Sequence, residues 1–173
     1  KSLIDFGAFS TTTGKWMQMG SAIPDIRTLF WVGKTTNENF PLGSTGTDYH
    51  FHSAGAGLPI WSTQYASSNI RNGTTWLNGT QVPGTLTNMP AWPALVRIGN
   101  STTANVNANT IGNDRAIRYG GVHPGEIMIF NTVLTFGGEP QSYAGPPPGL
   151  STRLFLRLGH GAAERRRPRG CAP

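Results

Sequence analysis

Carboxyl groups are the first candidates for chemistry in this chain, because cleavage of a glycosidic bond needs two of them facing each other across the bond. Glu126 is the only acidic residue within a segment of strong strand composition, residues 125–130. The sequence has no Glu-x-Asp or Glu-x-x-x-Glu pair that would place two carboxylates on one face of a strand. A glycosidase would therefore need a distant partner for Glu126, such as Asp48 or Asp114. The simpler interpretation is a sheet residue that pairs with a nearby arginine.

Two histidines form a second candidate group. His50 and His52 lie two residues apart in a segment that alternates aromatic and imidazole side chains. On a strand, this spacing puts both imidazoles on one face, where they could chelate Zn²⁺, Cu²⁺ or Fe²⁺ if a third ligand joined them. His123, Asp48 or Glu126 could be that ligand. The alternative is that both histidines hydrogen-bond a sugar on an open sheet face.

Aromatic side chains are the third candidate group, since exposed Trp and Tyr rings stack on sugar faces. The candidates are Trp61 and Tyr65, together with Trp76 and Trp92. Trp16 and Trp31 lie in segments of strand composition and are expected in the core.

Other chemistries find little support. The single cysteine, Cys171, lies near the end of the chain, and the sequence has no Gly-x-Ser-x-Gly motif and no phosphate-binding loop. Ca²⁺ remains a candidate ion, held by loop carbonyls with Asp48 or Asp114. No stretch is long and apolar enough for a membrane span. The basic residues of the first 135 positions are scattered, which argues against a nucleic-acid surface.

The elements that must position these residues are short strands. Charged residues make up only 13% of the chain, while 23 Gly and 13 Pro punctuate it. About ten strand-like segments favour an all-β sandwich or barrel. The strongest are residues 26–32, 94–98 and 125–130, and weaker ones are 2–10, 16–19 and 49–52. Two Asn-Gly pairs, at Asn72 and Asn78, each predict a tight type I′ turn. The polar run 99–113 is expected to be a long loop or a weak edge strand.

The sequence changes character after residue 135. Residues 136–173 are rich in Gly, Pro and Arg, and six of the fourteen basic residues lie after residue 150. We therefore divide the chain into a β-sandwich domain, residues 1–135, and a poorly ordered tail, residues 136–173, which is a linker or the product of a shifted reading frame. Residues 150–158 are expected to form a short helix or strand.

Four stretches together resemble the concanavalin A-like lectin/glucanase superfamily, in its laminin-G-like jelly-roll branch of bacterial surface and secreted proteins. They are residues 3–7 with 15–18, residues 26–32, residues 40–43 leading to 49–52, and residues 125–135. The segment Trp76-Leu-Asn-Gly79 is similar to the central strand and turn of that family. The resemblance implies two antiparallel sheets, an extracellular or cell-surface location, and ligands on the concave face or rim loops. Many members of the family bind glycans or proteins, often with Ca²⁺, and some hydrolyse polysaccharides.

The leading hypothesis is a non-catalytic module that binds a polysaccharide or cell-surface glycan, within a larger protein, through His50, His52, Trp61 and Tyr65. A polysaccharide hydrolase that uses Glu126, with a second carboxylate or a histidine-bound metal, is the alternative. A structural spacer without a small ligand is the third possibility. Fold alone does not choose among them.

Overall fold

The structure is a computed structural model. It describes residues 3–8, 10–35, 41–46, 50–55, 57–90, 94–99, 106–115, 117–134 and 152–157, with the backbone alone for most of 94–99 and for 152–157. The candidate-site predictions for Asp48 and Trp92 lie outside these ranges.

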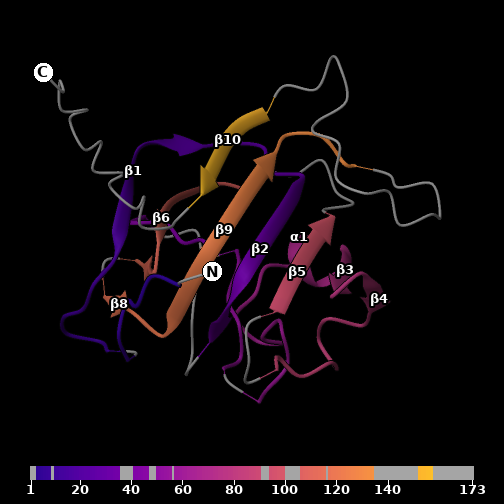
Figure 1. The fold of residues 1–173 in the computed structure, drawn as a ribbon, viewed down its shortest axis with the longest axis horizontal. Helices are drawn as coiled ribbons and strands as arrows, with labels where there is room; N and C mark the ends of the chain where they lie inside the picture. Colours follow the sequence, from indigo (N-terminus) through magenta and orange to yellow (C-terminus); the bar gives the residue numbers. More distant parts are fainter. Residues whose placement is uncertain are drawn as a thin grey trace, which may run out of the picture.

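The regular secondary structure in the described part of the chain is antiparallel strands with one short helix (Figure 1). The strands are β1 (Met17–Ile23), β2 (Thr28–Thr35), β3 (Thr74–Leu77), β4 (Thr80–Val82), β5 (Ala94–Gly99), β6 (Ala108–Ile111), β7 (Asn113–Asp114), β8 (Arg118–Tyr119), β9 (Val122–Phe130) and β10 (Thr152–Arg157). The helix α1 (Ser68–Arg71) has only four residues. The predicted all-β class is confirmed.

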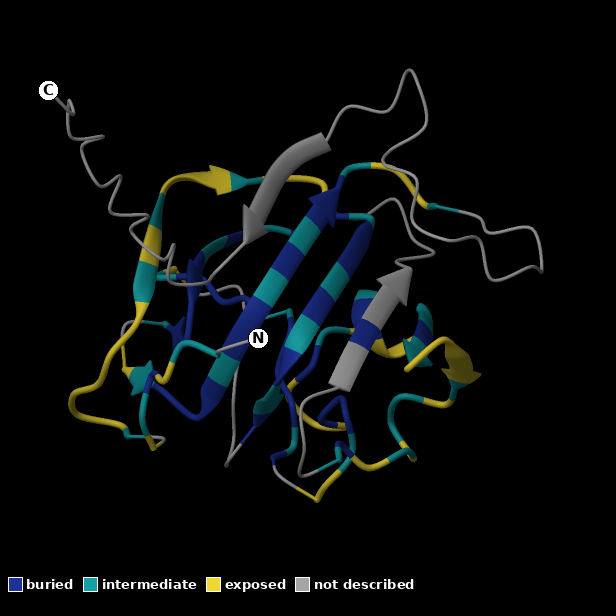
Figure 2. Cartoon of the chain, viewed as in Figure 1, coloured by how far each residue is buried: buried dark blue, intermediate teal, exposed yellow. Residues whose placement is uncertain are grey.

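A six-stranded sheet in the order β10-β9-β2-β5-β3-β4 is the largest element. Its centre, β2 and β9, comes from the two segments with the strongest strand composition, as predicted. Buried and half-buried positions alternate along both strands (Figure 2). Leu29 and Trp31 of β2 therefore point into the core with Ile127 and Ile129 of β9, each at most 1% exposed.

A smaller sheet, β1 with β6, belongs to the same hydrophobic cluster as the large sheet. β6 arises from the polar run that was expected to be a loop or a weak edge strand. It is a strand rather than a loop, with three of its four residues buried. Ala108 and Ile111 supply apolar contacts, and Thr110 satisfies its hydroxyl by donating to the Asn113 carbonyl at 2.6 Å. The run is so rich in Asn and Thr that its few inward-facing positions do not form a recognisable strand pattern.

The two Asn-Gly pairs have different structures. Asn78 and Gly79 both have positive φ, 50° and 86°, and join β3 to β4, which confirms the predicted tight hairpin turn. Asn72 has φ −91° and ends α1, with its N–H donating to the Ser68 carbonyl, so the predicted turn at Asn72 is wrong. Four residues after Ser67 close a helical turn there before the chain enters β3.

Two weaker strand predictions also fail. Residues 3–8 form no strand and are tied to β9 by the Ile4 N–H, which donates to the Pro124 carbonyl at 2.9 Å. Residues 50–52 form no strand either, and the neighbours Phe51 and His52 are both 1% exposed. The two-residue alternation that put His50 and His52 on one strand face therefore does not exist.

Trp16, expected in the core, is 36% exposed, whereas Trp31 is buried as predicted. The tail supplies one strand: β10 pairs with β9 from Thr152 opposite Phe130 to Arg157 opposite Glu126. The strand alternative for residues 150–158 is therefore confirmed, and the large sheet includes residues beyond the expected domain end at residue 135.

Candidate functional site

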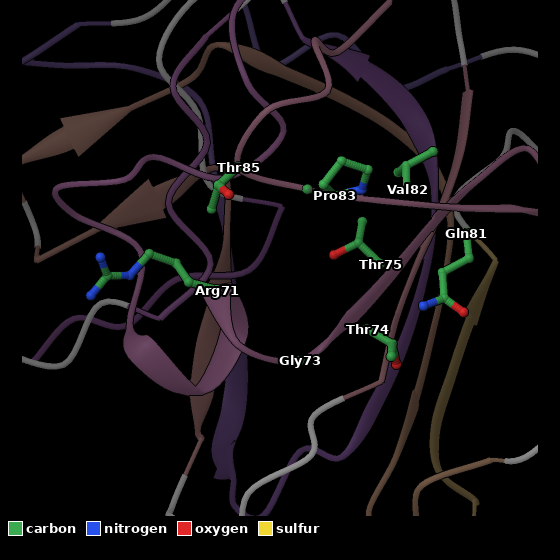
Figure 3. Close-up of a pocket in the computed structure, with 9 residues that line it drawn as sticks. Arg71, Gly73, Thr74, Thr75, Gln81, Val82, Pro83 and Thr85 are labelled. Carbon is green, nitrogen blue, oxygen red and sulfur yellow. The ribbon is translucent and has the colours of Figure 1, made fainter.

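An open groove with a volume of about 440 Å³ lies beside α1 and the β3–β4 hairpin (Figure 3). Its wall consists of short polar and apolar side chains and backbone: Arg71, Gly73, Thr74, Thr75, Gln81, Val82, Pro83, Gly84 and Thr85. A hollow of this size falls in the range of small-ligand sites.

Three consecutive elements position the wall. Arg71 is the last residue of α1, and Asn72-Gly73 then leads directly into β3, where Thr74 and Thr75 stand. The tight turn at Asn78-Gly79 brings the chain back along β4, which sets Gln81 opposite Trp76 in the ladder. Residues 83–85 close the groove on the remaining side.

Trp61 backs this wall from inside the protein. Its indole N–H donates to Thr75 Oγ1 at 3.0 Å, and its backbone N–H donates to the Gly84 carbonyl at 3.0 Å. A Cβ atom on Gly84 would lie 2.5 Å from Trp61 Cδ1, so only glycine fits there without displacing the ring. The large buried ring thus fixes two residues of the groove, Thr75 and Gly84.

Arg71 is an exposed side chain at the rim of the groove. Its Nη1 donates to the Thr63 carbonyl at 2.5 Å, which holds the guanidinium against the loop that leads to Tyr65. None of the residues that line the groove is an Asp, Glu, His or Cys. The groove therefore offers hydroxyl, amide and guanidinium hydrogen bonds, without the acid or base that hydrolysis requires.

The structure brings the four predicted glycan contacts, His50, His52, Trp61 and Tyr65, into one region. Hydrogen bonds from Ser62 N–H to the His52 carbonyl, 2.9 Å, and from Ser67 N–H to the His50 carbonyl, 3.2 Å, join the two segments that contain them.

Their exposures differ. Tyr65 is 38% exposed and packs on the His52 ring, with centroids 5.1 Å apart, while His52 and Trp61 are each 1% exposed. Of these three rings, only Tyr65 presents a stacking surface to solvent. His52 and Trp61 lie beneath the surface and cannot contact a ligand directly, and His50 is half-buried.

The expected metal ligands do not form a cluster in the described ranges. Across these ranges, no three His, Cys, Asp or Glu side chains gather in a way that could hold an ion. His52 is buried, with Nδ1 2.7 Å from the Ser53 carbonyl oxygen. His123 lies on β9 and contacts Asp5 instead, with Nδ1 3.2 Å from Oδ1.

Glu126 occupies a half-buried position on β9, opposite Val32 of β2 and Arg157 of β10 in the ladders. Neither ladder partner is acidic. Asp114, one of the two partners proposed for it, is fully buried, and its Oδ2 accepts a hydrogen bond from Arg115 Nε at 2.7 Å. Burial raises the pKa of the Asp114 carboxyl, and the Arg115 side chain opposes that rise. Asp114 is thus closed off from a polymeric substrate.

His123 is expected to titrate below the ordinary histidine value of 6.5. Burial lowers the pKa of its imidazole, and the Asp5 carboxylate raises it in part. Asp5→Asn should therefore lower the pKa of His123 further, as measured by NMR titration of the imidazole protons. A folded-state pKa below the unfolded one means that this histidine's contribution to stability is lost as pH falls below about 6.5. A pKa of His123 that rises in Asp5→Asn would contradict the contact.

Sequence reasoning missed Arg71, Gln81 and Thr85. Each is an ordinary surface residue in sequence, and the groove depends on α1, a four-residue helix that local pattern does not predict. The available signal was the pair of Asn-Gly sequences, which mark a compact turn-rich unit between residues 70 and 82.

Comparisons of the chain with family models, with curated proteins and with solved structures gave no match. Within the described residues, no helix is long and apolar enough to cross a membrane. Fold and site together define an all-β protein with an open groove that is lined by both polar and apolar groups and by no carboxylate.

Proposed function

We propose that this chain is a non-catalytic polysaccharide-binding module whose ligand lies in the groove between α1 and the β3–β4 hairpin. The six-stranded sheet and the β1–β6 pair would be the two layers of a concanavalin A-like jelly roll. The proposal includes an extracellular or cell-surface location and a place within a larger protein, as the resemblance to bacterial surface and secreted proteins implies.

The chemistry of the groove is the observation on which the proposal rests. Sugars present many hydroxyl groups and small apolar faces, so they suit a surface that mixes hydroxyl, amide and guanidinium groups with compact apolar side chains. The hydroxyl and amide groups come from Thr74, Gln81 and Thr85, and the compact apolar side chains are those of Val82 and Pro83. The exposed Tyr65 ring could stack on a sugar at the end of the groove where Arg71 lies. Arg71 donates a hydrogen bond to the carbonyl of Thr63, and Thr63 precedes Tyr65 by two residues.

Gln81→Ala is the direct test. We expect it to weaken retention on a polysaccharide panel, measured by affinity gel electrophoresis, by about two- to twelvefold, because one ligand hydrogen bond contributes about 0.5–1.5 kcal/mol. Gln18→Ala is the matched control, since Gln18 is an exposed glutamine of β1, in the other sheet. Equal retention of both variants and the parent on every polysaccharide bound would reject the groove as the site.

The hydrolase alternative makes a different prediction. If Glu126 were a catalytic acid, the protein would release reducing sugar ends from some polysaccharide, and Glu126→Gln would abolish that release. We expect no release by the parent and unchanged retention for Glu126→Gln, because the acidic partner that catalysis needs is absent from its ladder neighbours. A structural spacer would show neither release nor retention.

A further inference from the structure

We propose that the groove selects polysaccharides that carry carboxylates, uronate polymers, and that Arg71 is the residue that binds the carboxylate. This inference rests on the proposed function and goes further by naming the ligand class. It follows from the setting of one guanidinium group.

The Arg71 guanidinium is held in one orientation, but not all of its N–H donors are used by the described residues. A guanidinium has five N–H donors in a rigid plane. The bond from Nη1 to the Thr63 carbonyl is the hydrogen bond that fixes the plane, and with the described residues Arg71 makes no ion pair. Donors of the fork therefore remain for a ligand. A side chain already held in place loses less conformational freedom on binding than a free one.

The charge of Arg71 is not balanced within the groove. The other lining residues, Gly73 to Thr75 and Gln81 to Thr85, are all neutral. The guanidinium of Arg71 therefore gives the groove a positive charge at one end. The complementary ligand is an anion, and the planar fork matches a carboxylate through two parallel hydrogen bonds.

The remaining wall fits the rest of a uronate residue. Thr74, Gln81 and Thr85 provide neutral donors and acceptors for ring hydroxyls. Figure 3 shows the Arg71 side chain on the opposite side from Gln81 and Thr74, with its guanidinium end directed away from them. A carboxylate on the arginine would thus leave the sugar hydroxyls facing the amide and hydroxyl side. Because Arg71 is exposed, salt should weaken the preference for the acid.

The experiment compares one polymer in two charge states. Polygalacturonate and its full methyl ester have the same backbone, and calorimetry gives the affinity of the protein for each; alginate serves as a second uronate. We expect the parent to bind the acid forms at least tenfold more tightly than the ester, with the ratio shrinking at high salt. Arg71→Gln should bring the ratio close to one, because it should weaken binding of the acid forms far more than binding of the ester.

Lys15→Gln is the control, since it removes the same charge from an exposed position outside the groove and should keep the ratio. Thermal unfolding of each variant separates loss of binding from loss of fold. Equal affinity of the parent for acid and ester would overturn this inference and leave the proposed function standing. An equal loss for both forms in Arg71→Gln would overturn it as well. No binding of any acidic or neutral glycan would overturn both proposals.

Discussion

Trp61→Ala should destabilise the protein by about 3–5 kcal/mol, the usual cost of removing a fully buried large aromatic ring. Trp61 is 1% exposed and packs edge-on against Phe51, with ring centroids 6.5 Å apart. Its loss would leave a cavity behind the groove and would free Thr75 and Gly84, which the ring holds in place. Denaturant unfolding followed by far-ultraviolet circular dichroism measures the change in free energy of unfolding.

Two further variants separate the contributions of this side chain. Trp61→Phe keeps an aromatic ring but removes the N–H that donates to the Thr75 hydroxyl. Because Thr75 is only 2% exposed, its hydroxyl would lose a buried partner, and the free energy of unfolding should fall by about 1–3 kcal/mol. Trp16→Ala, at a tryptophan that is 36% exposed, should cost less than Trp61→Ala by several-fold. If Trp61→Ala and Trp16→Ala unfolded at the same denaturant concentration, the burial of Trp61 would be wrong.

Gly43→Ala should cost about 3 kcal/mol or more, at the upper end of what overpacking costs in proteins. Gly43 crosses β6 closely: its N–H donates to the Thr110 carbonyl at 3.0 Å, and its carbonyl accepts from Asn109 N–H at 2.9 Å. An added Cβ would overlap the Asn113 backbone oxygen and lie 2.8 Å from Thr110 Oγ1. Thr110 lies in β6 and Asn113 in β7, and both residues are fully buried, so neither atom can move aside at little cost.

Gly46→Ala is the matched control in the same loop. A Cβ on Gly46 would meet only the Ser44 hydroxyl at 3.4 Å, so the change should be within about 0.5 kcal/mol of neutral. Thermal melting of the two variants gives the comparison. A Gly43→Ala protein as stable as Gly46→Ala would show that residues 41–46 do not lie against β6 as described.

The central strands could be predicted from sequence because their signal is local. In β2 and β9, burial alternates along segments rich in apolar residues, and this two-residue period can be recognised in the sequence alone. The turn at Asn78-Gly79 is local in the same sense, since positive φ at two successive positions favours this dipeptide. Local signals such as these identified the all-β class.

The failures have a non-local cause. β6 is a strand because it pairs with β1, nearly ninety residues earlier, and its own sequence is polar and repetitive. His52 is buried because Ser62 and Tyr65 fold back over it, which overrides the alternation expected for a strand. Such contacts between distant segments cannot be read from a short pattern.

The candidate site was predictable in part. Aromatic type pointed to Trp61 and Tyr65; Trp61 lies behind the groove as a buried residue, and the exposed Tyr65 packs on His52 and does not line the groove. No sequence pattern distinguishes Arg71, Gln81 and Thr85. They become candidate ligand contacts only because the helix, the hairpin and the following loop place them around one groove.

The most direct test of a groove that binds glycans is a ¹H–¹⁵N NMR titration of the intact chain with a short polygalacturonate oligomer. We expect the largest chemical-shift changes at residues 71–75 and 81–85, including the Gln81 side-chain amide, with smaller changes at Tyr65. Changes centred on Glu126 and its neighbours in β2 and β9, or no changes with acidic and neutral oligomers alike, would contradict this expectation.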